Sequence, residues 1–318
     1  MNNICFFGLL HINHNENQKL NFQSLDKNFK VLTYLKNAVL LQKQLKRAGF
    51  NLVILTNKKN YLEKLLEEIN SDLNLKNLNF NTYVPKNTHF YSCHFRVDVF
   101  KYLSKLKKTF SILVDLDILV LDELSVFKKL ESSAAYVNDI TDNVIPAYGK
   151  KKILNNLRIL NKNIKTFKWY GGDFFAGNYK FFSILYRKTC FYQKKFVDNS
   201  SIFKSQTDEL FISAALNDIK LKKLYNFQSS ERKFLFTRFW NTNVKHKQKK
   251  ILFYKKFKLL HVPADKVFLS KCFNFYEGKT YLKEEYFKHV YSPYIVIKKK
   301  ISKFIPQKIK NFIKNGKK

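Results

Sequence analysis

The sequence is poor in acidic residues, glycine, proline and closely spaced cysteines, and each scarcity excludes a class of protein. Asp and Glu number 24 against 59 Lys and Arg, which gives a formal net charge of +35. The 8 Gly and 5 Pro are too few for a fibrous or low-complexity chain. The cysteines, at positions 5, 93, 190 and 272, lie too far apart for a zinc motif or a dense disulfide framework. We therefore expect a globular protein with reduced thiols.

Long apolar runs are also missing. No stretch approaches the length of about 18 apolar residues that a membrane span needs. The apolar run from Ile4 to Leu10 is too short for a secretion signal and has no basic lead-in, so it reads as a first strand. A chain of 318 residues suits one large α/β domain with a sizeable core. We expect it to remain in the cytoplasm.

The excess of positive charge predicts a polyanionic partner. Nucleic acids, anionic lipid headgroups and phosphorylated small molecules are all attracted by such a field, and charge alone does not choose among them. The sequence has no zinc-finger spacing, helix-turn-helix signature or aromatic RNA-binding strand motif. We therefore expect no specific nucleic-acid partner, although a nucleic-acid-binding protein is the strongest rival from another class.

Alternating strand and helix patterns predict a mostly parallel sheet that is flanked by helices on both faces. The expected strands are residues 3–7, 50–55, 80–84 and 110–114, and the expected helices are residues 30–48, 61–69, 95–106 and 206–216. Residues 258–268 are also strand-like. We expect one catalytic domain over residues 1–292, followed by a basic tail over residues 293–318.

Two acidic residues follow the most apolar of these strands. Asp115 and Asp117 come directly after the run from Phe110 to Val114 and precede a second apolar run. Side chains alternate along an extended segment, so two acids one residue apart point the same way and can share a cation. Hard oxygen ligands suit Mg²⁺ or Mn²⁺. The carboxyl edge of a parallel sheet is also where ligands bind.

In these features, from about residue 3 to residue 268, the sequence resembles the glycosyltransferase A fold, and specifically the retaining families 8 and 6. Members carry an Asp-x-Asp after a central strand. In family 8 a basic residue on the preceding helix contacts the sugar donor, and Arg96 in "HFRVDVFKYL" matches it. The alternative is a surface arginine on an amphipathic helix.

The segment "WYGGDFFAGNYKFF" is similar to the family pattern in which a glycine-rich turn approaches the sugar and the acceptor. This resemblance implies donor-binding roles for Gly172 and Gly177, because glycine permits close approaches that other residues block. It also implies that Asp173 accepts a hydrogen bond from a sugar hydroxyl.

The segment "QTDELFISAAL" resembles the acidic helix start of the same families. Family 6 presents a Glu near the anomeric carbon there, and Glu209 matches it, with Asp208 beside it. Family 8 has Gln at this place. A carboxylate at this position stabilises an oxocarbenium-like transition state or attacks it directly. The structural alternative is a helix capped by Thr207 with acids in its first turn.

The segment "HVPADKVF" resembles the closing motif of family 8, where a His completes the metal site and a Lys binds the diphosphate. His261 and Lys266 match these roles. The chain departs from the usual motif, which has Gly near the middle and Pro-Trp after the Lys. His11 and His14 lie in a polar loop without acidic partners, and we interpret them as surface residues.

The resemblance implies a divalent-metal-dependent, retaining glycosyltransferase. Such an enzyme moves a hexose-type sugar from a nucleotide-diphosphate sugar to a glycan or lipid-linked acceptor, for example in surface polysaccharide or lipopolysaccharide synthesis. The rival enzyme class is a metal-dependent nucleotidyltransferase or phosphatase. Two-metal chemistry of that kind usually recruits more carboxylates, and here the nearest further acid is Asp122.

The tail over residues 293–318 is basic and amphipathic. Apolar residues recur at spacings of three and four with lysines between them, interrupted by Pro306. Lysines near an anionic leaflet contribute on the order of 1 kcal/mol each. We expect the tail to bind an anionic membrane surface, which makes the protein peripheral on the inner membrane. The alternative is a tail packed on its own domain or disordered.

Overall fold

Two β-sheets organise the protein, and its computed structural model describes most of the chain. The described residues are 3–12, 27–85, 88, 90–203, 207–276, 278–293, 295–297 and 299. His14 and residues 300–318, which hold most of the predicted membrane-binding tail, lie outside them. The predicted domain boundary between residues 292 and 293 therefore stays a prediction.

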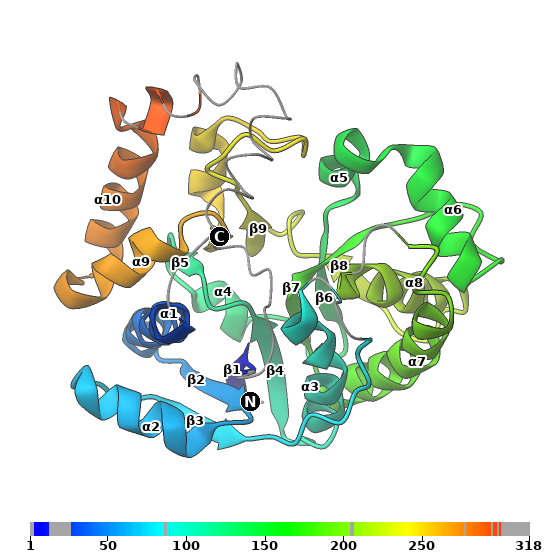
Figure 1. Ribbon diagram of the computed structural model, residues 1–318, viewed down its shortest axis with the longest axis horizontal. Coiled ribbons are helices and arrows are strands. Elements are labelled where there is room, and N and C mark those ends of the chain that lie inside the picture. Colours follow the sequence, from blue (N-terminus) through cyan, green and yellow to red (C-terminus); the bar gives the residue numbers. More distant parts are fainter. Residues whose placement is uncertain are drawn as a thin grey trace.

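The larger sheet has the strand order β3-β2-β1-β4-β7-β6-β8 (Figure 1). Within it β7 runs antiparallel to both of its neighbours, β4 and β6, and the other paired strands are parallel. The mixed, mostly parallel sheet predicted from the sequence is confirmed. The strands are β1 Asn3–Leu10, β2 Asn51–Thr56, β3 Asn74–Asn77, β4 Thr109–Val114, β6 Ala135–Asp139, β7 Tyr170–Gly177 and β8 Phe227–Ser229.

A second sheet of three short strands stands beside the carboxyl end of β4. Its order is β5-β10-β9, with β5 antiparallel and β9 parallel to the central strand. The strands are β5 Ile118–Val120, β9 Phe236–Arg238 and β10 Leu259–His261. Because β5 follows β4 after three residues, the small sheet brings β9 and β10 to the place where the Asp-x-Asp segment lies.

Helices surround both sheets (Figure 1). The α-helices are α1 Lys27–Arg47, α2 Lys59–Glu68, α3 Arg96–Leu103, α4 Ser125–Lys128, α5 Thr141–Tyr148, α6 Lys150–Leu160, α7 Tyr179–Asp198, α8 Asp208–Leu221, α9 Lys266–Cys272 and α10 Lys279–Tyr291. The 3₁₀ helices are η1 Tyr91–Phe95, η2 Ile251–Lys256 and η3 Phe273–Phe275. Among the described residues, no helix is long and apolar enough to cross a membrane.

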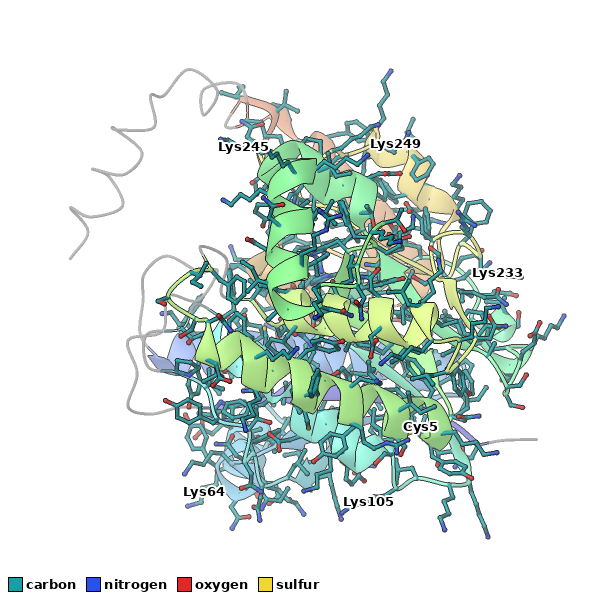
Figure 2. All side chains as sticks on the ribbon, turned by 90° about the vertical axis from the view of Figure 1, so that its right-hand side faces the viewer. Cys5, Lys64, Lys105, Lys233, Lys245 and Lys249 are labelled. Atoms are coloured by element: carbon teal, nitrogen blue, oxygen red, sulfur yellow. The ribbon has the colours of Figure 1, made fainter. Side chains whose placement is uncertain are left out.

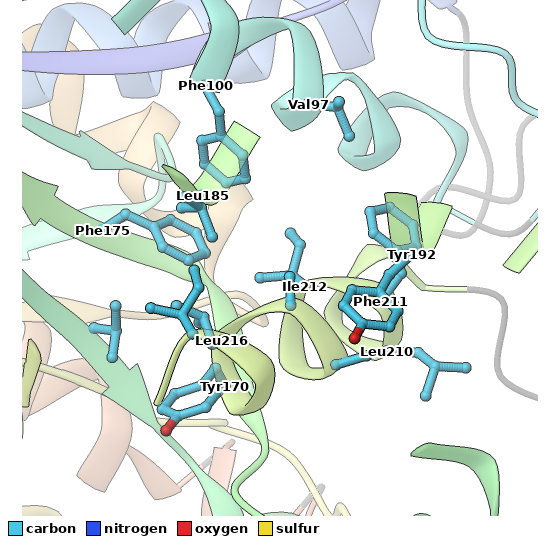
Figure 3. Packing of buried hydrophobic residues seen from close by; sticks show 14 of the residues in the cluster. Val97, Phe100, Tyr170, Phe175, Leu185, Tyr192, Leu210, Phe211, Ile212 and Leu216 are labelled. Atoms are coloured by element: carbon cyan, nitrogen blue, oxygen red, sulfur yellow. The ribbon is translucent and has the colours of Figure 1, made fainter. Parts of the chain in front are cut away.

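The larger sheet separates two apolar cores because side chains alternate along its strands. In β7, Phe174 belongs to the core beneath α1 and α2, whereas Phe175 belongs to the core beneath α3, α7 and α8. Figure 3 shows Phe100 of α3 and Leu185 of α7 close to Phe175 in this second core. The centroids of the Phe100 and Phe175 rings are 5.1 Å apart in an edge-to-face contact. Strands buried on both faces explain the continuous apolar runs in the sequence.

Three local predictions are wrong. Residues 258–268 form a strand only over Leu259–His261, because the chain leaves the small sheet there and α9 begins at Lys266. Residues 80–84 form no strand, because Leu75 of β3 takes the edge position beside Ile54 and the chain then crosses the end of the sheet. There the Thr82 amide donates to Asp98 Oδ2 and the Phe80 ring packs on Phe95. The glycine-rich segment is not a turn either. It forms β7, which is buried along its whole length.

Gly8 of β1 makes room for the segment that links the two sheets. It pairs with Val114, the last residue of β4. A Cβ atom on Gly8 would lie 2.5 Å from Leu116 Cδ2 and 2.9 Å from Ile54 Cδ1. Leu116 therefore packs directly over the backbone of β1, and this inward packing of the middle residue leaves Asp115 and Asp117 on the other side of the segment.

Replacing Gly8 with Val should displace Leu116 and lower the free energy of unfolding by about 1–3 kcal/mol, the usual cost of overpacking a core. Chemical denaturation followed by circular dichroism measures the change. Asn51→Ala, at an exposed position of β2, is the control and should change stability by less than about 0.5 kcal/mol. Equal stability of the two variants would show that Leu116 does not need this space.

Candidate active site

Three potential metal ligands meet beside the carboxyl end of β4. Asp115 and Asp117 flank Leu116 in the link to β5, and His261 ends β10, directly opposite Ile118 in the small sheet. One ligand atom from each residue lies within 4.8 Å of the others. The His261 Nε2 atom is 3.1 Å from Asp117 Oδ2 and 3.6 Å from Asp115 Oδ2. The convergence predicted from the sequence for these three side chains is present.

The orientation of His261 is set by Asp173 of β7. The Asp173 Oδ2 atom lies 2.7 Å from Nδ1, so that carboxylate accepts the Nδ1 proton and turns Nε2 toward the two aspartates. Nε2 is buried and lies close to both aspartates without a well-aligned hydrogen bond to either, which is the environment of a metal ligand.

Opposite charges surround Asp117. The Lys266 ammonium at the start of α9 donates to Asp117 Oδ2 and to the carbonyl of Pro263. Burial raises the pKa of Asp117, but the neighbouring Lys266 and His261 outweigh burial and hold this pKa well below its usual value. Burial lowers the pKa of His261, but Asp117 and Asp173 outweigh burial and raise it to about 9. Asp117 is therefore an anion throughout the neutral range.

Arg96 links Asp115 of the triad to Asp208 at the start of α8. It is the first residue of α3 and is buried, so the surface alternative for it is wrong. Its Nη1 donates to Asp208 Oδ2 at 2.6 Å, and its Nη2 donates to Asp115 Oδ1. A Cβ atom on Gly172 would lie 2.8 Å from Arg96 Nη1, so glycine is needed for the guanidinium to lie against β7. Burial raises the pKa of Asp208 to about 6, in spite of Arg96.

Glu209 is held by three donors, from β9, from β7 and from the residue that precedes β7. Arg238 Nη2 of β9 donates to its Oε1 at 2.8 Å, and the Gly172 amide reaches the same atom at 3.3 Å. The indole Nε1 of Trp169 donates to Oε2 at 3.0 Å. Thr207 is the N-cap of α8, but its side chain makes no capping hydrogen bond. The acids of the first helical turn therefore have partners outside the helix.

The charge balance of the cluster fits a divalent cation. The five carboxylates described above face three cations, Arg96, Arg238 and Lys266, so two negative charges remain before His261 is counted. Burying uncompensated charge is costly, and an ion of charge +2 at the triad restores neutrality. Two carboxylates and one imidazole provide part of an octahedral shell and leave positions for substrate oxygens. The residues present therefore fit a divalent metal.

The structure corrects three residue assignments. Asp173 is fully buried, and it accepts hydrogen bonds from His261, from Arg238 Nε at 2.6 Å and from Asn138 Nδ2 at 3.0 Å. It positions other side chains and has no surface for a sugar hydroxyl. Gly177 pairs with Ser111 toward the opposite end of β4, where its missing Cβ makes room for a phenylalanine ring.

The third correction concerns His11, which is not a surface residue. Its ring centroid lies 4.2 Å from that of Phe95 and 5.3 Å from that of Phe80. Its Nδ1 is 3.4 Å from Ser92 Oγ. Burial lowers the pKa of His11 to about 4, so the ring is neutral at physiological pH. It closes the end of the sheet by ring packing.

Sequence reasoning missed Arg238, Asn138 and Trp169. Arg238 lies in a basic stretch where nothing local distinguishes it, and only the pairing of β9 with β10 brings it to Asp173 and Glu209. Composition offered one signal. Arginine and tryptophan are rare in this lysine-rich chain, and this site contains Arg96, Arg238 and one of the two tryptophans.

No family model matches the chain, and no curated protein matches its sequence. Several solved structures are similar to it at low identity. Mouse xyloside xylosyltransferase 1 has a TM-score of 0.44 and 11% identity, over 81% of this chain and 96% of that one. The galactosyltransferase LgtC with donor and acceptor sugar analogues has a TM-score of 0.48 and 10% identity, over 87% and 99%. The bifunctional WbbM has a TM-score of 0.47 and 10% identity, over 82% and 45%.

Each of these similar structures is a glycosyltransferase by name.

Proposed function

We propose that this protein is a divalent-metal-dependent glycosyltransferase that uses a nucleoside-diphosphate sugar. The observation that carries the proposal is the triad of Asp115, Asp117 and His261, which lies in a cluster whose five carboxylates exceed its arginine and lysine cations by two. Mn²⁺ or Mg²⁺ held there supplies charge compensation for the oxygens of a departing diphosphate. The triad lies at the carboxyl edge of the sheet, where α/β proteins bind nucleotides.

Cationic side chains around the triad support a diphosphate ligand. Lys266 at the start of α9 donates to Asp117, and Arg96 at the start of α3 donates to Asp115. With a cation held by Asp117, the Lys266 ammonium would be available to a phosphate oxygen, for which a compact charge needs no fixed geometry. Arg96 stays bound to Asp208 and keeps Asp115 oriented. Lys266 thus retains the diphosphate-binding role that the motif implied.

Glu209 is the side chain best suited to act on the sugar. Its side chain is 17% exposed to solvent. Its three hydrogen bonds fix the direction of the carboxylate. Three such donors favour electrostatic stabilisation of an oxocarbenium-like transition state over direct attack. Both routes are compatible with retention of the anomeric configuration, and we propose retention.

A nucleotidyltransferase or phosphatase remains the second candidate class. Two-metal chemistry needs further free carboxylates near the triad. Asp122, the nearest further acid in sequence, pairs with Lys258 instead. Asp173 and Asp208 are near but engaged by arginines. Product analysis separates the classes, because a sugar transferase releases a nucleoside diphosphate rather than pyrophosphate or inorganic phosphate.

Asp117→Asn should abolish the stabilisation of the protein by Mn²⁺ with a nucleoside-diphosphate sugar. A ligand present at about one hundred times its Kd stabilises the native state by about 2.7 kcal/mol, which a thermal-shift screen of donors detects. Asp122→Asn, five residues away and outside the triad, is the matched control and should respond like the wild type. A normal metal response in Asp117→Asn would refute the metal site.

Glu209→Gln should lower kcat for sugar transfer by about 10²–10³-fold while donor binding persists, because it removes the charge facing the reacting carbon. Glu131→Gln, at an exposed position outside the cluster, should leave kcat unchanged. NMR of the first-formed product should show the anomeric configuration of the donor. A product with the inverted configuration would show that Glu209 does not have the proposed role.

We also propose that the protein docks on an anionic membrane surface to reach a glycan or lipid-linked acceptor at the inner membrane. The chain has no acidic residue from position 232 to position 264 and eight lysines there. Within this stretch η2 exposes 57% of Leu252, and Lys255 lies over the ring of Phe287 on α10. The end of α10 exposes Tyr291, followed by exposed Ile297. Exposed apolar groups among lysines suit an interfacial surface.

Reversal of two charges by Lys245→Glu and Lys249→Glu should reduce binding to phosphatidylglycerol vesicles by at least tenfold, at about 1 kcal/mol for each lysine lost. Figure 2 shows these lysines at one end of the molecule and Lys64 and Lys105 at the other. The matched control is therefore Lys64→Glu with Lys105→Glu, measured by vesicle co-sedimentation. Equal losses in the two pairs would mean that no particular face binds the membrane.

A further inference from the structure

A row of aromatic rings leads away from Glu209. The Trp169 ring, whose Nε1 holds Glu209, lies 6.4 Å from the ring of Tyr148 at the end of α5. Tyr148 lies 5.7 Å from His246 in an edge-to-face contact, and His246 lies 6.1 Å from Trp240. The two tryptophans of the chain are thus the two ends of the row.

The outer part of the row is open to solvent. Tyr148 is 40% exposed, and His246 and Trp240 are half-buried, whereas Trp169 is buried. A row that served only core packing would be covered along its length. The Trp240 Nε1 atom is buried and has no hydrogen-bond partner among the described residues.

A small cavity lies between the row and the arginine that holds Glu209. It encloses about 20 Å³, and Asn138, Thr237, Arg238, Trp240 and His246 are among the residues that line it. That volume admits one water-sized group, such as a hydroxyl. Its lining offers amide, hydroxyl and guanidinium groups beside two rings, which is the mixture that positions a polar, ring-shaped ligand.

The segment that presents Trp240 and His246 is fixed to α5. The Lys247 amide donates to the carbonyl of Asn143, and Asn143 Nδ2 donates to the carbonyl of Lys247. The Gln248 side chain brackets the backbone of Trp240, accepting from its amide at 2.6 Å and donating to its carbonyl at 3.1 Å. The spacing between Tyr148 and the two outer rings is therefore built into the fold.

We propose that Tyr148, His246 and Trp240 form an acceptor subsite for a sugar ring, with one hydroxyl of that sugar in the cavity beside Arg238. Aromatic faces carry negative potential and attract the polarised C–H groups of a pyranose, while the cavity supplies hydrogen-bonding partners. Trp169 at the inner end of the row and Arg238 in the cavity lining both donate to Glu209. The subsite therefore lies on the Glu209 side of the cluster. This inference rests on the proposed function and assigns the acceptor end to a carbohydrate rather than to a lipid alcohol.

Intrinsic fluorescence tests the subsite directly, because both tryptophans belong to the row. The full chain with Mn²⁺ and a nucleoside diphosphate (UDP, GDP or CDP in turn) is titrated with lactose and with methyl glycosides of glucose, galactose and N-acetylglucosamine. We expect a saturable change with at least one sugar. Tyr148→Ala should weaken that binding at least tenfold, and Tyr148→Phe, which keeps the ring, should bind nearly as the wild type does.

Tyr83→Ala is the matched control, because Tyr83 is 67% exposed and belongs to none of these contacts. It should bind the sugar normally, and thermal unfolding checks that all variants are folded. The proposal is overturned if no sugar of the panel binds at millimolar concentration, or if Tyr148→Ala and Tyr83→Ala bind equally well. Metal-dependent nucleotide binding is measured separately, so its persistence without sugar binding rejects the subsite and leaves the proposed function standing.

Discussion

The concentration of five carboxylates at one edge of the sheet is the constraint on which the site depends. Acids are scarce in this chain, yet a fifth of them meet within a few ångströms of β7, where burial makes an unpaired charge costly. Two arginines, a lysine and a histidine lie beside these carboxylates and compensate part of their charge. Without His261 the compensation is incomplete by two charges, and this residual charge gives the cluster a reason to bind a divalent cation in place of the imidazole proton.

Each compensating cation comes from a different element, so the cluster forms only when the whole fold is assembled. Arg96 comes from α3, Arg238 from β9 and Lys266 from α9. Arg96 and Arg238 lie against β7, because its two adjacent glycines leave room for their guanidinium groups beside the backbone. A Cβ atom at Gly171 would lie 3.0 Å from Arg238 Nη2, and one at Gly172 would lie 2.8 Å from Arg96 Nη1. Close backbone approach, rather than a flexible turn, is what these glycines provide.

The negative centre contrasts with the positive charge of the molecule as a whole. A net charge of +35 attracts phosphorylated ligands and anionic surfaces from a distance, subject to screening by salt. At the cluster itself the sign is reversed, so a phosphorylated ligand needs a cation between itself and the aspartates. Under the proposed function, the long-range field raises the local concentration of an anionic donor, and the local site selects for a donor that arrives with a metal.

Periodicity predicted β1, β2 and β4, the helices α1, α2, α3 and α8, and the position of Asp115 and Asp117, because alternation and apolar runs are local properties of the chain. Motif resemblance also brought His261, Arg96 and Glu209 into one site. Sequence alone did not identify Arg238 or the aromatic row, since short strands and loops far apart in the chain form them and no local pattern marks their partners. It misread Asp173, because an acid in a strand looks the same whether it faces a cleft or a buried histidine. The direction of that side chain was decided by tertiary packing, which placed His261, Arg238 and Asn138 around its two oxygens.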